Sequence, residues 1–254
     1  MHRTLTAAIA VALVALCLAP AASAEQKETE RVSKVVPISQ GGRLTLKNFS
    51  GRVTITAADR NDVAIDAVRR ATRERLDHIK LDIQASGKTV EIEANRRDEN
   101  WSEKNDNVVE TDFDIQVPRE LDLKIHVFSS PVGITGVQGD LDVESFSGTL
   151  VLKDTTGRLE LKTFSGNIRV GAGGAGDTPA IEAETFSGDI EAAVAPTASA
   201  DVDFSTFSGD IDSDLPLTLK TKSKRTLRAT LNNGAANALR FKTFSGDVRL
   251  VGSK

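Results

Sequence analysis

LELKTFSGNIRV, residues 159–170, decides the fold of this chain, because its central tripeptide Phe-Ser-Gly recurs along the 254 residues. Six copies begin at Phe49, Phe146, Phe164, Phe186, Phe207 and Phe244, and Phe128-Ser129-Ser130 is a degenerate seventh. Seven of the ten phenylalanines therefore belong to one repeated element in a chain that is otherwise poor in aromatic residues. The repeat is where we expect the core to be specified.

Apolar residues alternate on both sides of the tripeptide. Leu159 and Leu161 precede Phe164, and Ile168 and Val170 follow it. This period of two predicts a strand on each side of a corner. If Thr163 and Phe164 both face inward, the chain must bulge between them, and the glycine after the serine gives the corner its freedom.

This interpretation makes the repeated phenylalanines an internal stack, with serine as an outward hydrogen-bonding residue and glycine as the hinge. Each buried ring contributes roughly 1.5–3 kcal/mol to folding. The predicted internal ladder consists of Phe49, Phe128, Phe146, Phe164, Phe186, Phe207 and Phe244.

The spacing of the copies predicts an all-β solenoid of stacked coils. From Phe128 the steps are 18, 18, 22, 21 and 37 residues. A step of this size accommodates strand, turn, strand and corner before the next coil begins. A β-sandwich of antiparallel hairpins is the alternative, but a sandwich has no reason to repeat one corner tripeptide.

The first 24 residues predict a cleaved signal peptide. Basic His2 and Arg3 precede an apolar run over 5–18, and a small-residue cleavage site follows at 22–24. The single cysteine, Cys17, lies inside this segment. We therefore expect an exported protein of the periplasm, outer envelope or medium that uses no disulfide.

The rest of the chain predicts one elongated β domain over 35–254, after a flexible charged arm over 25–34. Residues 35–120 form an N-terminal β region that closes the first end of the solenoid, with a hairpin of 79–84 and 89–93. The charged stretch 69–78 fits a loop or a short helix. Regular coils occupy 121–254, with the longest insertion at 213–236.

The composition is that of an ordinary soluble protein, with 39% hydrophobic residues and a net charge of −4. Nothing in it indicates a nucleic-acid partner. The long insertion carries an alternating basic strand pair that would suit an anionic lipid, a polysaccharide or simple solvation. The candidate interaction residues are Lys220, Lys222, Lys224, Arg225, Arg228 and, in a polar loop, Trp101.

Acidic residues follow the glycine in three copies, at Asp189, Asp210 and Asp247. Stacked carboxylates could bind a hard cation such as calcium. The favoured interpretation is that they satisfy backbone donors at the turn, because other copies have Asn167, Thr149 and Arg52 there. We predict neither a metal site nor a cofactor.

Other acidic residues alternate on outward strand positions, namely Asp140, Asp142, Glu144, Glu182 and Glu184. Paired carboxylates hydrolyse glycosides when their separation is correct. Outward charges on strands more often serve solvation. His78 and His126 belong to no motif, and the repeated serines have no evident base or orienting partner.

The chain stops four residues after Leu250 without an obvious cap. An uncapped terminal coil exposes unpaired backbone groups, and this predicts edge-mediated self-association.

The repeated Ser-Gly-Asp steps resemble a family of bacterial exported proteins built on a domain of unknown function and described as "putative adhesins". The matching segments are 117–123, 136–141 and the Phe-Ser-Gly-Asp units, and the resemblance runs from about Val35 to the end. It implies a β-solenoid at the cell envelope. This chain departs from the family in placing Phe where relatives have smaller or polar residues.

Together these features predict a non-enzymatic envelope or secreted protein with a binding or structural role. Its partner would be an envelope component, either a polysaccharide or a protein. The alternative is a polysaccharide-active enzyme on the same scaffold, since fold alone does not establish function.

Overall fold

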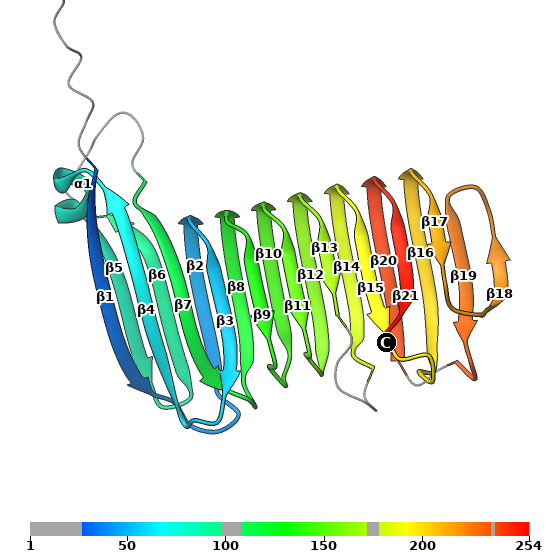
Figure 1. Ribbon diagram of the computed structural model, residues 1–254, viewed down its shortest axis with the longest axis horizontal. Helices are drawn as coiled ribbons and strands as arrows, with labels where there is room; N and C mark the ends of the chain where they lie inside the picture. The colour runs from blue at the N-terminus through cyan, green and yellow to red at the C-terminus, as the bar shows by residue number, and fades with distance from the viewer. Residues whose placement is uncertain (1–26, 98–107, 172–177, 235–236, 254) are drawn as a thin grey trace, which may run out of the picture.

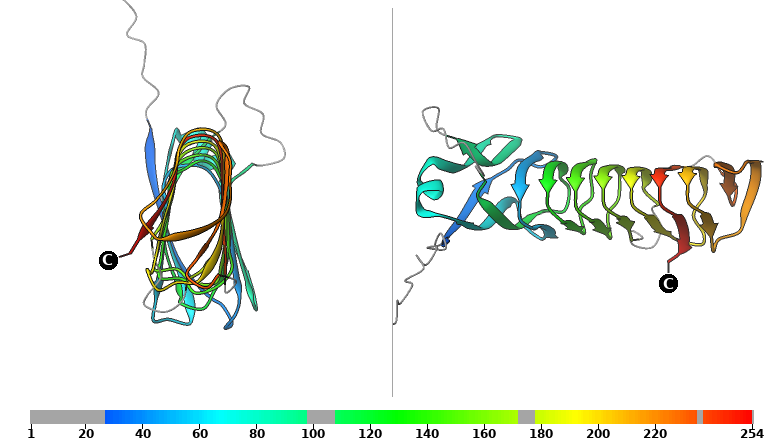
Figure 2. Two further views of the ribbon diagram at one scale, coloured as in Figure 1. Left: turned by 90° about the vertical axis from the view of Figure 1, so that its right-hand side faces the viewer. Right: turned by 90° about the horizontal axis from the view of Figure 1, so that it is seen from above.

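The protein, described here by a computed structural model, is an elongated β-solenoid whose two sheets face each other across a narrow core (Figures 1 and 2). The structure describes residues 27–97, 108–171, 178–234 and 237–253. Strands of neighbouring coils pair in parallel along most of the molecule. The predicted solenoid is confirmed, and the sandwich of antiparallel hairpins is not the fold.

In the described residues, sheet A has ten strands and sheet B has eleven, and one short helix lies at the N-terminal end. In spatial order, sheet A contains β1 (Glu28–Pro37), β4 (Asp62–Ala71), β7 (Glu110–Pro118), β3 (Val53–Ala58), β9 (Val132–Thr135), β11 (Leu150–Lys153), β13 (Ile168–Val170), β15 (Ile190–Val194), β21 (Val248–Gly252) and β17 (Ile211–Ser213). In spatial order, sheet B contains β18 (Leu217–Lys222), β19 (Thr226–Leu231), β16 (Ala200–Ser208), β20 (Asn237–Ser245), β14 (Ala180–Ser187), β12 (Arg158–Ser165), β10 (Leu141–Ser147), β8 (Asp122–Ser129), β2 (Arg43–Ser50), β6 (Thr89–Arg97) and β5 (Ile79–Ser86). The helix α1 spans Arg73–His78.

Each regular coil runs along a sheet B strand, turns the Phe-Ser-Gly corner and returns along a sheet A strand. The corners are in register, since Ser147 pairs with Ser165 and Ser165 with Ser187. Apolar residues from both strands of a coil meet inside, and Leu159, Leu161 and Ile168 are fully buried. The core is therefore a stack of aliphatic rows.

The repeated phenylalanines lie outside this core, so the predicted internal ladder is wrong in its direction. Their side chains are 42–50% exposed, whereas Thr163, one residue earlier than Phe164, is buried. The strand keeps its alternation through the phenylalanine, with Leu159, Leu161 and Thr163 inward and Phe164 outward. No bulge is needed, and small residues fill the core next to the corner.

Glycine at the corner is required by the close approach of neighbouring coils. Gly188 has a φ of 151°, and a Cβ there would lie 2.2 Å from the carbonyl oxygen of Gly166. That same carbonyl accepts a hydrogen bond of 3.2 Å from the buried hydroxyl of Thr185. Threonine before the phenylalanine and glycine after the serine thus act together to tie one coil to the next.

The order of coils in space differs from their order in the chain. The last strand pair, β20 and β21, inserts between β14–β15 and β16–β17. The prediction of an uncapped C-terminal coil is therefore wrong, because β20 and β21 each have a neighbouring strand on both sides. Residues 217–231 instead form the antiparallel hairpin β18–β19, which covers β16.

At the end of the solenoid opposite the N-terminal region, the edge strands β17 and β18 carry features that oppose edge pairing. β17 is only three residues long, and β18 carries Lys220 and Lys222 beside a register shift between Leu219 and Thr221. Short strands, lysines and bulges are the means by which sheet edges avoid pairing with other chains.

The N-terminal region closes the other end of the solenoid with antiparallel strands. β5 and β6 form the expected hairpin, and Gly87 lies in its turn. The stretch 69–78 divides between the end of β4 and helix α1. Buried Arg69 binds Glu30 and the carbonyl of Ile79, which joins β1 to this cap.

The flexible arm predicted over 25–34 is wrong for residues 28–34, which belong to β1. This strand pairs with β4 over ten residues from Glu28 to Pro37. Its side chains are mostly exposed, so the sequence shows no core-facing pattern. Backbone pairing with the free edge of β4 holds the segment in place instead.

The predicted signal peptide, residues 1–24, and Trp101 lie outside the described residues. Within the part of the chain that the structure describes, no helix has the length and apolar character needed to cross a membrane.

Candidate functional site

One feature of the outer surface stands apart from the charged strands around it: a continuous row of stacked phenylalanine rings on sheet B. Neighbouring centroids are 4.7–5.0 Å apart, and interplanar angles are 14° or less. We call this row the phenylalanine stripe, and in spatial order it contains Phe49, Phe128, Phe146, Phe164, Phe186, Phe244 and Phe207.

The period of the stripe is the strand spacing of the sheet, because each coil supplies one ring in register. Six steps give a length of roughly 29 Å. Stacking covers the ring faces, but each side chain keeps nearly half of its surface in solvent. Contiguous exposed apolar surface of this kind marks an interaction site in soluble proteins.

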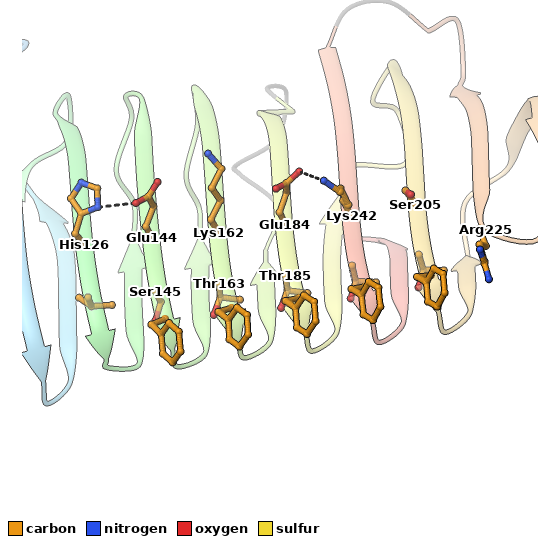
Figure 3. Close-up of a pocket in the computed structure, with 18 of the residues that line it drawn as sticks. His126, Glu144, Ser145, Lys162, Thr163, Glu184, Thr185, Ser205, Arg225 and Lys242 are labelled. Carbon is orange, nitrogen blue, oxygen red and sulfur yellow. Dashed lines mark hydrogen bonds and ion pairs between the residues drawn. The ribbon is translucent and has the colours of Figure 1, made fainter.

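An open groove of about 890 Å³ runs beside the stripe, across five coils from Phe146 to Phe207. The rings form one wall. The other wall is a row of polar side chains two residues before each phenylalanine, and Figure 3 shows this row crossing the strands. We call it the polar row, and it contains His126, Glu144, Lys162, Glu184, Lys242 and Ser205.

Charges in the polar row alternate in sign and are paired locally. Lys242 Nζ lies 3.2 Å from Glu184 Oε1, and His126 Nδ1 lies 3.1 Å from Glu144 Oε2. Lys162 Nζ donates to Glu160 Oε1 at 2.5 Å. This hydrogen bond lowers the pKa of Glu160 and raises the pKa of Lys162. The groove wall is therefore close to neutral.

A guanidinium group covers the end of the stripe at Phe207. Arg225 Cζ lies 3.9 Å from the ring centroid of Phe207, in a cation–π contact. Arg225 also lines the groove (Figure 3). It is the one member of the predicted basic set that the structure brings to the stripe.

The other predicted basic residues lie on the β18–β19 hairpin or the turn that joins its strands. Lys220 forms a 2.8 Å ion pair with Asp201, and Arg228 lies 3.3 Å from Asp203. Lys222 and Lys224 are exposed to solvent. The predicted strand pair exists, but two of its charges are compensated by β16, so the hairpin is not a uniformly basic face.

The acidic residues after the corner glycine hydrogen-bond to the neighbouring coil. Asp189 Oδ1 accepts from the backbone N–H of Asp247 at 2.9 Å, and Asp247 Oδ1 accepts from that of Asp210 at 2.8 Å. The side chain of Asn167 does the same for Asp189 at 2.9 Å. The interpretation as backbone acceptors is confirmed for Asp189 and Asp247, although the donors come from the next coil. In the described ranges, no cluster of three or more potential metal-binding side chains occurs.

The acidic residues considered for catalysis also form hydrogen bonds or ion pairs with neighbouring strands. Asp140 Oδ1 accepts from the Arg158 backbone N–H at 3.3 Å, and Asp142 lies 3.6 Å from Lys124. Glu182 lies within 4.0 Å of Arg158 and Arg240. His126, which belongs to no motif, lies 3.1 Å from Glu144 on the outer surface.

Sequence reasoning missed the groove, although one signal for it was present. The position before each phenylalanine is Asn, Ser or Thr in six of seven copies, and these residues are buried. Continuing the alternation of the strand by one residue would have placed every phenylalanine outside.

Three comparisons relate the chain to known proteins. A "putative cell adhesion protein" from Clostridium sporogenes has a solved structure with 9% identity and a TM-score of 0.54, over 89% of this chain and 100% of that one. A "putative adhesin" from Bacteroides fragilis has 12% identity and a TM-score of 0.31, over 87% and 97% of the two chains. No curated protein matches.

At these identities the first likeness shows the fold alone. Family membership rests on the sequence, because residues 114–251 match the profile of the family described as Toastrack DUF4097. The matched range covers more than half of the chain and contains most of the coils, which agrees with the resemblance expected from the repeated corner. The chain therefore belongs to the Toastrack DUF4097 family.

Proposed function

We propose that this protein is a non-enzymatic binding protein of the cell envelope and that the phenylalanine stripe is its binding face. The observation that carries the proposal is the exposure of seven stacked rings in a line on one surface. A soluble protein keeps such a surface at a cost in solubility, which is consistent with a partner that covers it.

The signal-like segment over 1–24 supports export, and the adhesin names of the structural relatives agree with an envelope location. An enzyme on the same scaffold has less support. The acidic residues on sheet B are in ion pairs or hold backbone donors, and the groove beside the stripe is walled by rings and paired charges. No observation in the described residues favours a particular reaction.

The test is retention of the purified protein on isolated envelope fragments. The stripe variant replaces three central rings, Phe164, Phe186 and Phe244, by Ser. The matched control replaces Arg169, Glu191 and Arg249 by Ala, which are exposed residues on sheet A of the same three coils.

We expect the stripe variant to lose most of its retention and the sheet A control to keep it. Circular dichroism melts establish that each variant is folded at the assay temperature. Equal retention of the wild type, the stripe variant and the control would contradict the proposal. So would a loss confined to the sheet A control.

A further inference from the structure

The groove beside the phenylalanine stripe has a restricted chemistry, and that chemistry indicates its ligand. Along the central rings the interplanar angles are only 1–5°, so each ring face is covered by the next ring. The ring edges face outward. Sugars and nucleobases stack on open aromatic faces, which the stripe does not offer between its ends.

The groove also offers no free backbone hydrogen-bonding groups to an extended peptide. In a β-sheet the backbone N–H and C=O groups point toward neighbouring strands, which here is along the solenoid axis. Peptide recognition by strand addition needs a free sheet edge. The strands that form the groove floor, from β10 to β16, are all paired on both sides.

The charges beside the groove exclude a polyanion or polycation as the main occupant. Glu144, Lys162, Glu184 and Lys242 alternate along the polar row, so their fields cancel over its length. An uncharged chain therefore meets no net field along most of the groove. Arg225 places a cation at the end of the stripe, over Phe207.

We propose that the groove binds the acyl chain of a single-chain amphiphile, with its anionic headgroup at Arg225. The proposal rests on the proposed function and names its ligand class. Five rings separated by four strand spacings give the groove a length of about 19 Å. This exceeds the roughly 15 Å of hydrocarbon in one leaflet of a bilayer, so a membrane-length acyl chain fits.

The ring edges and the aliphatic parts of Lys162 and Lys242 supply apolar contact along this length. Lysine stems cover apolar surface while their ammonium groups remain in water. The chain would displace water from the exposed half of each ring. The headgroup, either carboxylate or phosphate, would accept from the Arg225 guanidinium, which presents a planar set of donors.

The experiment measures displacement of a fluorescent fatty acid from the purified protein, below the micelle concentration of every ligand. Laurate, myristate and palmitate test chain length, and palmitoyl lysophosphatidylglycerol tests the lipid form of the anion. Monopalmitoylglycerol is the uncharged ligand of matched chain length. We expect affinity to rise about twofold for each added methylene, because one side of the chain stays in water.

Two variants test the two ends of the proposed ligand. Replacing Phe164, Phe186 and Phe244 by Ser should weaken palmitate at least about tenfold, while the sheet A control with Arg169, Glu191 and Arg249 replaced by Ala leaves it unchanged. Arg225→Gln should weaken palmitate several-fold but leave monopalmitoylglycerol unchanged. Tighter binding of the lysolipid than of palmitate identifies a lipid headgroup as the preferred anion, and the reverse identifies a free fatty acid.

Affinity that is independent of chain length, or equal for the wild type and the stripe variant, would overturn the proposal. Stripe-dependent dimerisation, seen by sedimentation in the absence of ligand, would also overturn it, because a second copy would then cover the rings. If palmitate fails while envelope retention still depends on the stripe, the ligand class is wrong and the binding face stands. If both fail, both proposals fall.

Discussion

Strand β16 places one phenylalanine in the core and another on the surface, three residues apart. Phe204 is fully buried and stacks on Phe241 with centroids 5.4 Å apart, whereas Phe207 is 50% exposed and stacks on Phe244 at 4.7 Å. Both pairs are stacked phenylalanine rings, and both join β16 to β20. Strand phase alone decides which pair stabilises the core and which forms the stripe.

The two pairs therefore have different roles in the same sheet. The inner pair fills space between the sheets, and its loss leaves a cavity. The outer pair gains about half of the burial and keeps surface available for contact with a partner. Stability and binding are thereby separated onto the two faces of the same strands.

The sharpest test of this separation compares Phe241→Ala with Phe244→Ala. Phe241 is 2% exposed, so its truncation creates a cavity and should cost about 3–5 kcal/mol. Phe244→Ala on the same strand is the matched control and should cost far less. Urea unfolding followed by circular dichroism measures both. Equal costs would mean that the outer ring is as well packed as the inner one.

The corner glycine provides the next largest expected effect. In Gly188→Ala the new Cβ would lie 2.2 Å from the Gly166 carbonyl at a φ of 151°, which should cost about 2–3 kcal/mol. Ser187→Ala, at the exposed neighbour, should change the free energy of unfolding by less than about 0.5 kcal/mol. If Gly188→Ala unfolds like the wild type, the close approach of neighbouring coils does not require glycine at this corner.

The stripe itself should contribute modestly to stability. Phe164 is 48% exposed, so Phe164→Ala should cost about 1 kcal/mol, which is half of a fully buried ring or less. The same denaturant series gives the value. A cost of several kcal/mol would show that stacking along the outer surface stabilises the coils more than burial predicts, and would favour a structural role for the stripe.

The smallest expected effect is the pH dependence of a carboxylate in the N-terminal cap. Partial burial raises the pKa of Asp112, but hydrogen bonds from the Arg52 backbone N–H and from Arg70, with the charges of both arginines, outweigh it and hold this pKa below its ordinary value.

Because the pKa of Asp112 is depressed in the folded state, its contribution is present at neutral pH and is lost as pH falls through the folded pKa. About a third of the side chain is exposed, so solvent screening limits the contribution to less than about 1 kcal/mol. We expect the unfolding curves of Asp112→Asn and the wild type to differ slightly at pH 7 and to converge as the pH falls below the ordinary pKa range of an aspartate. A difference that grows toward acid pH would reverse the assignment.

Much of the architecture could be predicted from the sequence because it depends on local periodicity. The apolar alternation around Leu159 and Ile168, repeated in the same phase from copy to copy, predicts the strands, the corner and the length of each coil. The hairpin over 79–93 followed from alternation around Gly87. Those signals are carried by neighbouring residues, which is why they survive without a structure.

Two features leave no signal in the sequence, and a third has a misleading one. Large apolar residues are usually buried, so Phe164 suggests an inward position, although the phase of Leu161 and Thr163 places it outside. The insertion of β20 was hidden because coil interfaces are alike: Thr185 and Thr243 make the same hydrogen bond to a glycine carbonyl. β1 has almost no buried face, so no periodicity marks it.

The groove belongs to the same class of features, because its walls come from six sheet B strands spread over about 120 residues of sequence. Arg225 belongs to the basic set expected from the sequence, but its contact with Phe207 depends on the hairpin folding back beside β16. Residues that combine only through coil stacking leave no local pattern.

Thiol labelling tests the central claim, that the stripe is an outward binding face, most directly. In a Cys17→Ser background, which removes the single cysteine, a maleimide reports on Phe186→Cys, Thr185→Cys and Glu191→Cys in turn. We predict that the cysteine at 186 reacts rapidly and becomes protected when envelope fragments are added. The cysteine at 185 should be protected throughout, and the one at 191 should react in both conditions. Rapid reaction at 185 with protection at 186 in the free protein, or reactivity at 186 that envelope fragments leave unchanged, would contradict the account.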